Sequence, residues 1–99
     1  IACTEEARAG LNITIKDAET NLYLSEGVSV IATDGSYSEA LISFDVVEPI
    51  FSGAYEREGN YIITVSKSGY VTYTSEIITV TSDVCHVIPQ QITILLQPE

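Results

Sequence analysis

Apolar and polar side chains alternate along much of the chain, and this alternation is the period of a β-strand with one buried face. Leu11, Ile13 and Ile15 alternate with polar residues in the first such run. Residues 61–66 repeat the pattern with an aromatic or aliphatic side chain at every second position. Each run is therefore predicted to form a strand whose apolar face packs on a core.

Turn signals separate the alternating runs. Asp34-Gly35, Glu58-Gly59-Asn60 and Ser68-Gly69 each lie next to such a run, and we expect Gly59 and Gly69 to adopt the positive φ of tight turns. Further strands are expected at residues 28–33, 37–47, 70–74, 77–81 and 92–96. Short strands at regular spacing are typical of a sandwich, so the sequence predicts an all-β fold, an antiparallel Greek-key β-sandwich of about seven strands, immunoglobulin-like in its general plan.

Two finer expectations follow from the same pattern. The strand at residues 37–47 would place Leu41 on one face and four apolar side chains on the other, namely Ala40, Ile42, Phe44 and Val46. Tyr61 and Tyr70 would bury their rings while their hydroxyl groups reach backbone or water. Residues 11–99 are expected to form a single sandwich domain, with residues 1–10 as a tail or tether.

Charge narrows the choice of partners. Four Lys and Arg residues against fourteen Asp and Glu residues give a net charge of −10 for the 99 residues. Such a field repels the phosphates of nucleic acids and of anionic membrane surfaces, so neither is an expected partner. No stretch approaches the roughly 18 consecutive apolar residues that cross a bilayer.

The residues that carry most enzyme chemistry are scarce. His86 is the only histidine, and its neighbour Cys85 would point to the opposite face of a strand, which disfavours a Cys–His nucleophilic pair. We expect His86 to be a structural, partly buried side chain near a strand start. Carboxylates gather at Asp45 and Glu48, at Glu56 and Glu58, and at Asp34 and Glu39. Without a D-x-D-x-D-G run they favour a solvated acidic surface over a weak calcium site, so no catalytic residue, metal or cofactor is predicted.

The two cysteines, Cys3 and Cys85, admit three interpretations. A disulfide between them would tie the N-terminal tail to the segment before the last strand. Alternatively, Ile1-Ala2-Cys3 is the end of a bacterial lipobox, and Cys3 carries the lipid. In the third interpretation both are buried free thiols. The first two place the chain outside the cytoplasm: secreted, periplasmic or lipid-anchored at the cell surface.

Six of the eight aromatic residues are tyrosines. Tyr55 and Tyr73 lie in or beside predicted loops, or on faces that read as polar, so they are the candidates for an exposed binding surface. Such a surface would stack on sugars or contact a protein.

From Leu11 onward, a series of short motifs resembles one known family. Residues 13–21 are similar to a first strand followed by a D-x-x-T-G turn, with Asn21 where the family has glycine. Further motifs follow in order: A-x-V, matched in part at 27–30; D-G-x-Y at 34–37; G-x-Y-x-x-x-V at 59–65; G-Y at 69–70; and a closing strand at 91–96. The family is the carboxypeptidase regulatory-like domain, a prealbumin-like (transthyretin-like) β-sandwich. Residues 51–57 with 83–87 resemble a subset found in bacterial lipoproteins and secreted proteins.

The resemblance implies a non-catalytic structural, adhesive or binding accessory module. Its partners would be a protein or a cell-surface polysaccharide, with membrane contact only through a lipid on Cys3, and it would be a monomer or an edge-strand dimer. One alternative is a small transthyretin-related hydrolase, but that family uses several histidines and a Tyr-Arg-Gly-Ser-like tail, whereas this chain ends Leu96-Gln97-Pro98-Glu99. A ligand-carrying oligomer is the other alternative.

Overall fold

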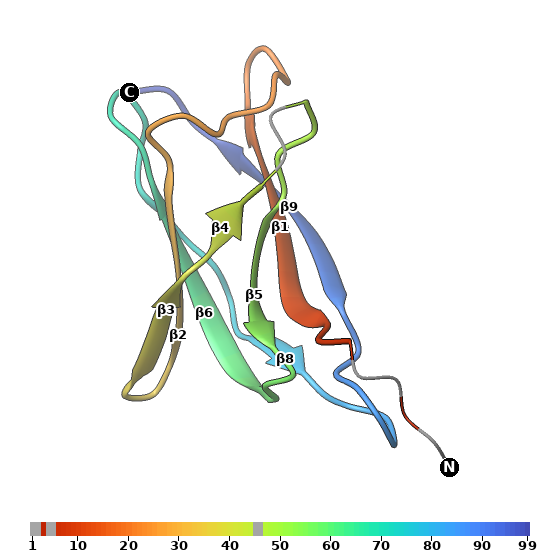
Figure 1. Cartoon of the computed structure of the whole chain (residues 1–99). Helices are drawn as coiled ribbons and strands as arrows, with labels where there is room; N and C mark the ends of the chain where they lie inside the picture. Colours follow the sequence, from red (N-terminus) through yellow and green to blue (C-terminus); the bar gives the residue numbers. More distant parts are fainter. Residues whose placement is uncertain (1–2, 4–5, 45–46) are drawn as a thin grey trace.

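The computed structural model describes residue 3, residues 6–44 and residues 47–99. The expected helix-free fold is confirmed in this part of the chain, where two β-sheets face each other (Figure 1). The strands are β1 (Ala9–Asp17), β2 (Ser29–Asp34), β3 (Tyr37–Ala40), β4 (Ile42–Ser43), β5 (Phe51–Tyr55), β6 (Gly59–Ser66), β7 (Tyr73–Thr74), β8 (Ile78–Val80) and β9 (Gln90–Leu96). Over the described ranges no helix is long and apolar enough to span a membrane.

The two sheets differ in strand direction. One has the order β3-β2-β6-β7, with β8 also paired to β6, and all its pairs are antiparallel. The other has the order β4-β5-β1-β9 and is mixed, because β1 and β9 run parallel from Leu11↔Gln90 to Asp17↔Leu96. The predicted antiparallel arrangement therefore fails at this pair. Parallel neighbours need a long connection, and here most of the chain lies between the first strand and the last.

The core lies between the sheets, on the faces that the alternation predicts. Leu11, Ile13 and Ile15 of β1 are fully buried, and so are Tyr61, Ile63 and Val65 of β6. The same core cluster also contains Val30, Ala32, Leu41, Phe51, Ala54, Val80, Val87, Ile94 and Leu96. Both of the clearest alternating runs thus form the central strands of their sheets.

The single strand predicted over residues 37–47 was wrong, because the chain changes sheets at Leu41: β3 pairs with β2 in one sheet and β4 pairs with β5 in the other. The predicted division of faces is present over residues 40–44, where Leu41 is buried while Ala40, Ile42 and Phe44 are exposed. The face that carries more apolar side chains is thus the exposed one, and Phe44 is 81% exposed. Val46, also placed in that pattern, lies outside the described residues.

This crossover closes one side of the sandwich. Leu41 lies so close to Gly53 of β5 that a Cβ at position 53 would overlap its Cδ2 atom and stand 2.7 Å from Glu39 Oε2. Glu39 Oε1 also accepts a hydrogen bond of 3.0 Å from the amide of Ala54. Side chains from β3 and from the crossover thus cover the gap between the two sheets on this side.

The positive φ predicted for Gly59 and Gly69 is confirmed for one of the two glycines and wrong for the other. Gly69 has a φ of +86°, as expected of a tight turn, but Gly59 is the first residue of β6 and is not among the positive-φ residues. Gly59 instead allows close packing, since a Cβ there would stand 2.5 Å from Asp34 Oδ2. Asn21, at the turn position where the resembled family has glycine, has a φ of +60°. Asparagine tolerates this conformation better than most residues do.

Candidate functional site

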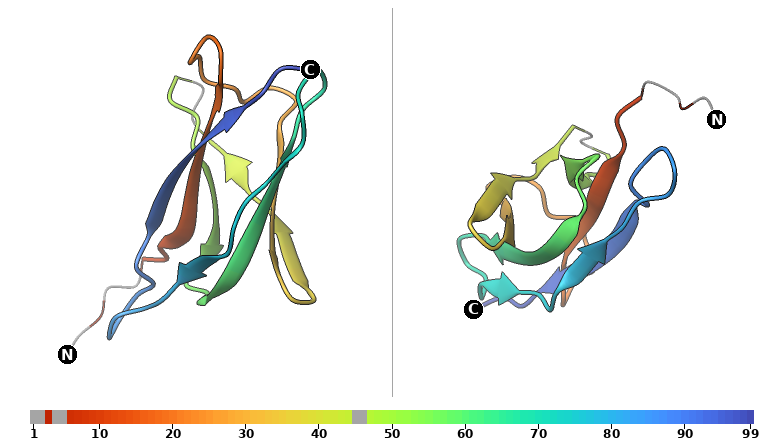
Figure 2. Two further views of the ribbon diagram at one scale, coloured as in Figure 1. Left: turned by 180° about the vertical axis from the view of Figure 1, so that it is seen from behind. Right: turned by 90° about the horizontal axis from the view of Figure 1, so that it is seen from below.

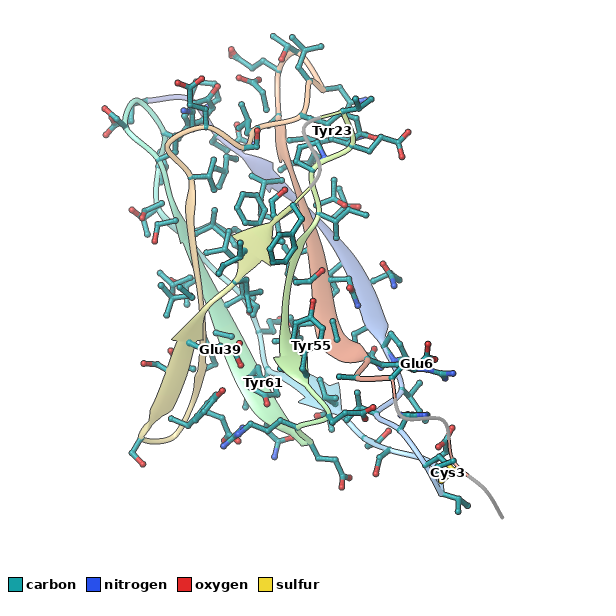
Figure 3. The ribbon with its side chains drawn as sticks, viewed as in Figure 1. Cys3, Glu6, Tyr23, Glu39, Tyr55 and Tyr61 are labelled. Atoms are coloured by element: carbon teal, nitrogen blue, oxygen red, sulfur yellow. A yellow bond between two sulfur atoms is a disulfide. The ribbon has the colours of Figure 1, made fainter. Side chains whose placement is uncertain are left out.

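Three segments meet at the end of the molecule that carries the N-terminus. They are the chain before β1, the turn between β5 and β6, and the loop between β8 and β9 (Figure 3). A disulfide joins Cys3 to Cys85, with 5.3 Å between their Cα atoms. The chain of 82 residue steps between the two cysteines is therefore closed into a covalent loop. Of the three interpretations of the cysteines, this structure contains the first, a disulfide.

Glu56 connects the three segments. Its Oε1 accepts a hydrogen bond of 2.9 Å from the amide of Val87, and its Oε2 accepts one of 3.2 Å from the amide of Arg8. The same oxygen contacts Nδ1 of the buried His86. The pKa of Glu56 lies below its ordinary value of 4.5, mainly because of the hydrogen bond from the Val87 amide and next because of the contact with His86. Glu56 also has a φ of +50°, in the left-handed region that L residues seldom adopt.

Asp83 organises the loop that holds the histidine. Its Oδ1 accepts hydrogen bonds from the amides of His86, at 2.9 Å, and of Cys85, at 2.8 Å. These two bonds, largest first, lower the pKa of Asp83 below its ordinary 3.8. Such side-chain-to-backbone bonds shape a tight loop locally.

A shallow acidic pocket of about 400 Å³ opens at this end. Its lining includes Glu6, Glu56, Glu58, Ser82, Asp83, Val84, Cys85, His86 and Val87. The sulfur of Cys85 is bound in the disulfide, so it is not available as a nucleophile beside the histidine. Among the residues that the structure describes, no group of three or more His, Cys, Asp and Glu side chains is arranged to hold a metal ion. Asp45, from the predicted acidic clusters, lies outside the described residues.

A second polar cluster gathers residues of the D-G-x-Y and G-x-Y motifs around Arg57. The guanidinium of Arg57 lies 3.6 Å from the ring centroid of Tyr37 and donates to Asp34 Oδ2 at 3.1 Å. It also donates at 2.8 Å to the hydroxyl of Tyr61, which donates back to the carbonyl of Arg57 at 3.0 Å. The hydroxyl of Tyr61 thus meets backbone, as expected, while its ring is buried.

Arg57 was not predicted as a central residue. The available signal was its position as one of only four cations in an acidic chain, between two carboxylates in sequence. Its contacts with the two tyrosines and with Asp34 bridge the β2–β3 turn and the start of β6. The cluster therefore ties the β2–β3 turn to the turn between β5 and β6, which connects the two sheets.

A third cluster, at the end of β1, explains the D-x-x-T turn. Asp17 Oδ1 accepts hydrogen bonds from the amides of Glu19, at 2.7 Å, and Thr20, at 2.9 Å. Asp17 Oδ2 accepts one of 2.5 Å from the hydroxyl of Tyr70, which reaches a carboxylate and not the backbone or water that the sequence analysis expected. The hydrogen bond from the Tyr70 hydroxyl is the largest cause that lowers the pKa of Asp17, and the bond from the Thr20 amide is the next. The bond between Tyr70 and Asp17 also raises the pKa of Tyr70.

The two tyrosines predicted as a binding surface do not come together. Tyr55 ends β5 in one sheet, and Tyr73 begins β7 at the edge of the other. Each is partly exposed, Tyr55 more than Tyr73. Figure 3 labels Tyr55 in the lower part of the view. The two tyrosines therefore do not form one patch; Tyr73 lines a separate groove of about 380 Å³.

The sequence matches no protein-family model and no curated protein. Assignment to a family therefore rests on the short motifs alone, and function must be argued from the geometry above.

Proposed function

We propose that this chain is a non-catalytic, extracytoplasmic β-sandwich module with a structural, adhesive or binding role. The disulfide between Cys3 and Cys85 is the observation that carries the proposal. Disulfides persist in oxidising compartments and are rare in the reducing cytosol. In the chain-entropy model, a disulfide that closes so long a loop stabilises the folded protein more than one that closes a short loop.

The surroundings of His86 support a role without catalysis. Its Nδ1 contacts Glu56, whose two oxygens also hold the amides of Arg8 and Val87. Glu56 thus joins the histidine to the same contacts that hold three chain segments together, which supports a structural role for His86. Its neighbour Cys85 has no free thiol in the disulfide-bonded form.

The same proposal includes membership of the carboxypeptidase regulatory-like domain family. It also includes the Greek-key, prealbumin-like topology of that family. The motif residues Asp34, Tyr37 and Tyr61 gather around Arg57, which supports a structural reason for their presence in a sandwich of this kind. The partner is then a protein or a cell-surface polysaccharide. A lipid on Cys3 remains the alternative to the disulfide, because one sulfur atom cannot form both a thioether and a disulfide.

Hydrolysis assays test the absence of catalysis. The oxidised 99-residue chain and its His86→Ala variant would be incubated with peptide, ester and glycoside substrates. The proposal predicts no turnover above the uncatalysed rate for either protein. Turnover by the parent chain that disappears in His86→Ala, with the variant still folded by circular dichroism, would replace it with the hydrolase alternative.

A further inference from the structure

The two long sides of the sandwich are closed differently. On one side the β3–β4 crossover covers the gap between the sheets, as described above. On the other side β9 runs next to β7 and β8 (Figure 2), and among the described residues the backbone bonds between these two edges lie toward the ends. At one end the amide of Val71 donates to Gln97 O at 2.9 Å, and at the other the amide of Ile88 donates to Thr81 O at 2.8 Å.

Between these two closures the core is incompletely covered. Ile78 of β8 and Ile92 of β9 pack against the core, yet both remain partly exposed. Together with Tyr73 and Ile77 they line the groove of about 380 Å³. An apolar side chain inserted from outside would complete the burial of these isoleucines, and burial of apolar area is the main favourable term in association.

The two sheet edges beside the groove differ in their capacity to pair with an added strand. The sheet edge at β7 and β8 is interrupted at Ser75, whose hydroxyl accepts a bond of 2.8 Å from the amide of Ile63 in place of a carbonyl. In contrast, β9 is a continuous strand of seven residues without charge or proline, and β1 is its sole partner among the described strands. Natural edge strands are usually protected by charge, proline or a bulge, so β9 is the edge suited to receive another strand.

Charge indicates what kind of strand this edge would receive. The four cations of the chain are engaged within it: Arg57 with Asp34, Arg8 with Glu6, Lys67 with the carbonyl of Glu26, and Lys16 over the ring of Tyr23. Glu76 lines the groove itself. With a net charge of −10, two copies of the chain would repel each other, whereas a basic segment would be attracted.

We propose that β9 binds an extended, basic segment of a protein partner by strand addition. The added strand pairs with the free edge of β9, its apolar side chains enter the groove beside Ile78 and Ile92, and its Lys or Arg side chains face the acidic surface. This inference rests on the proposed binding role and selects a protein partner over a polysaccharide.

The test uses the oxidised full chain, labelled with 15N, and a synthetic probe. The probe is a blocked peptide as long as β9, seven residues, in which valine alternates with threonine and lysine stands at both ends. The same peptide with glutamate at both ends is the control. We expect the lysine peptide to shift the amide signals of residues 91–95 and 73–78, with binding that weakens as salt is added.

Matched variants show whether the groove is the binding site. Ile77 lines the groove, whereas Leu22, on the β1–β2 loop, does not; the two residues are 64% and 65% exposed. Ile77→Lys should weaken binding about tenfold or more, and Leu22→Lys by about twofold or less, although both add one positive charge. Either substitution replaces an exposed side chain, so both variants are expected to fold.

Four results would overturn the inference: no binding of the lysine peptide, equal binding of the glutamate peptide, shifts at β3 or β4, or a concentration-dependent dimer that moves the same β9 signals. None of these touches the proposed non-catalytic function, which fails only on measured turnover or on the chemical state of the cysteines. The two proposals can therefore fail separately.

Discussion

At the scale of single residues, carboxylates stabilise this fold by accepting hydrogen bonds from several donors at once. Asp17, Glu56 and Asp83 each accept bonds from backbone amides, and Asp17 also accepts one from the hydroxyl of Tyr70. The pKa of each of the three is lowered by these bonds. A depressed pKa in the folded state means that the ionised carboxylate stabilises the fold.

We predict that acid destabilises the protein through these groups. Because their folded pKa values lie below the ordinary 3.8 of Asp and 4.5 of Glu, the added stability is complete above those values. It is lost as pH falls below them and through the lower folded pKa values. Urea denaturation between pH 7 and pH 2 would show a constant free energy of unfolding at first and a fall at the acid end. A free energy that rises as pH falls from the ordinary values would contradict the assignment.

The substitution Tyr70→Phe tests the largest contribution to Asp17. Removal of the hydroxyl should raise the Asp17 pKa toward 3.8, lower the stability at neutral pH and reduce the acid-dependent part of the unfolding free energy. The carboxyl 13C signal of Asp17, followed by NMR against pH, measures this pKa. Tyr73→Phe, which alters an edge tyrosine of the groove, is the control and should leave Asp17 unchanged. An identical Asp17 titration in Tyr70→Phe would refute the role of the hydroxyl.

A second residue-level prediction concerns the close contact of Gly53 with Leu41. Gly53→Ala should cost about 1–3 kcal/mol of unfolding free energy, since the new methyl group overlaps Leu41 Cδ2. In a Leu41→Ala background the same change should cost less, because the obstructing methyl group is gone. A double-mutant cycle by urea denaturation measures the difference. Equal costs in both backgrounds would show that Leu41 is not the obstacle.

At the scale of elements, local alternation predicts the strands that stay within one sheet. For β1 and β6 the buried positions follow directly from the sequence, because each strand keeps one face on the core along its length. Residues 37–44 depart from the predicted single strand because the chain crosses between sheets at Leu41, and the alternation, which continues through the crossover, carries no information about a change of sheet. The parallel pairing of β9 with β1 is similarly invisible to a local pattern.

The face assignment of β6 is testable with two adjacent isoleucines. Ile63 is 0% exposed and Ile62 is 38% exposed on the opposite face. Ile63→Ala should cost about 2–5 kcal/mol, whereas Ile62→Ala, identical in chemistry, should cost about 1 kcal/mol or less. Chemical denaturation of the two variants measures both values. A larger loss for Ile62→Ala would mean that the register of β6 is shifted by one residue.

At the scale of the whole molecule, contacts between distant segments close the ends of the sandwich. The sequence offered the Cys3–Cys85 bond as one of three interpretations, because the chain has only two cysteines. It did not suggest that Glu56 would meet His86, thirty residues away, or that Arg57 would join Tyr37. Carboxylates and tyrosines are numerous in this chain, so their pairing depends on the tertiary fold. For the same reason, the groove beside β9 emerges only from the arrangement of the strands.

The disulfide should contribute substantially to stability. Closure of a loop of 82 residue steps restricts the unfolded chain, and its loss should cost about 2–5 kcal/mol. The paired substitutions Cys3→Ser and Cys85→Ser, made together, should lower the free energy of unfolding by this amount. Reduction of the parent chain should produce the same loss, while reductant should not affect the double variant. Equal stability of the reduced and oxidised parent would contradict the prediction.

The proposed extracytoplasmic role depends above all on the chemical state of the cysteines in the native protein. The intact mass of the protein isolated from its native host, recorded with and without reductant, determines that state. A disulfide-bonded module should gain the mass of two hydrogen atoms on reduction and carry no further modification at Cys3. An unchanged mass with both thiols free would contradict this account, and a mass raised by acyl chains on Cys3 would replace the disulfide with a lipid anchor.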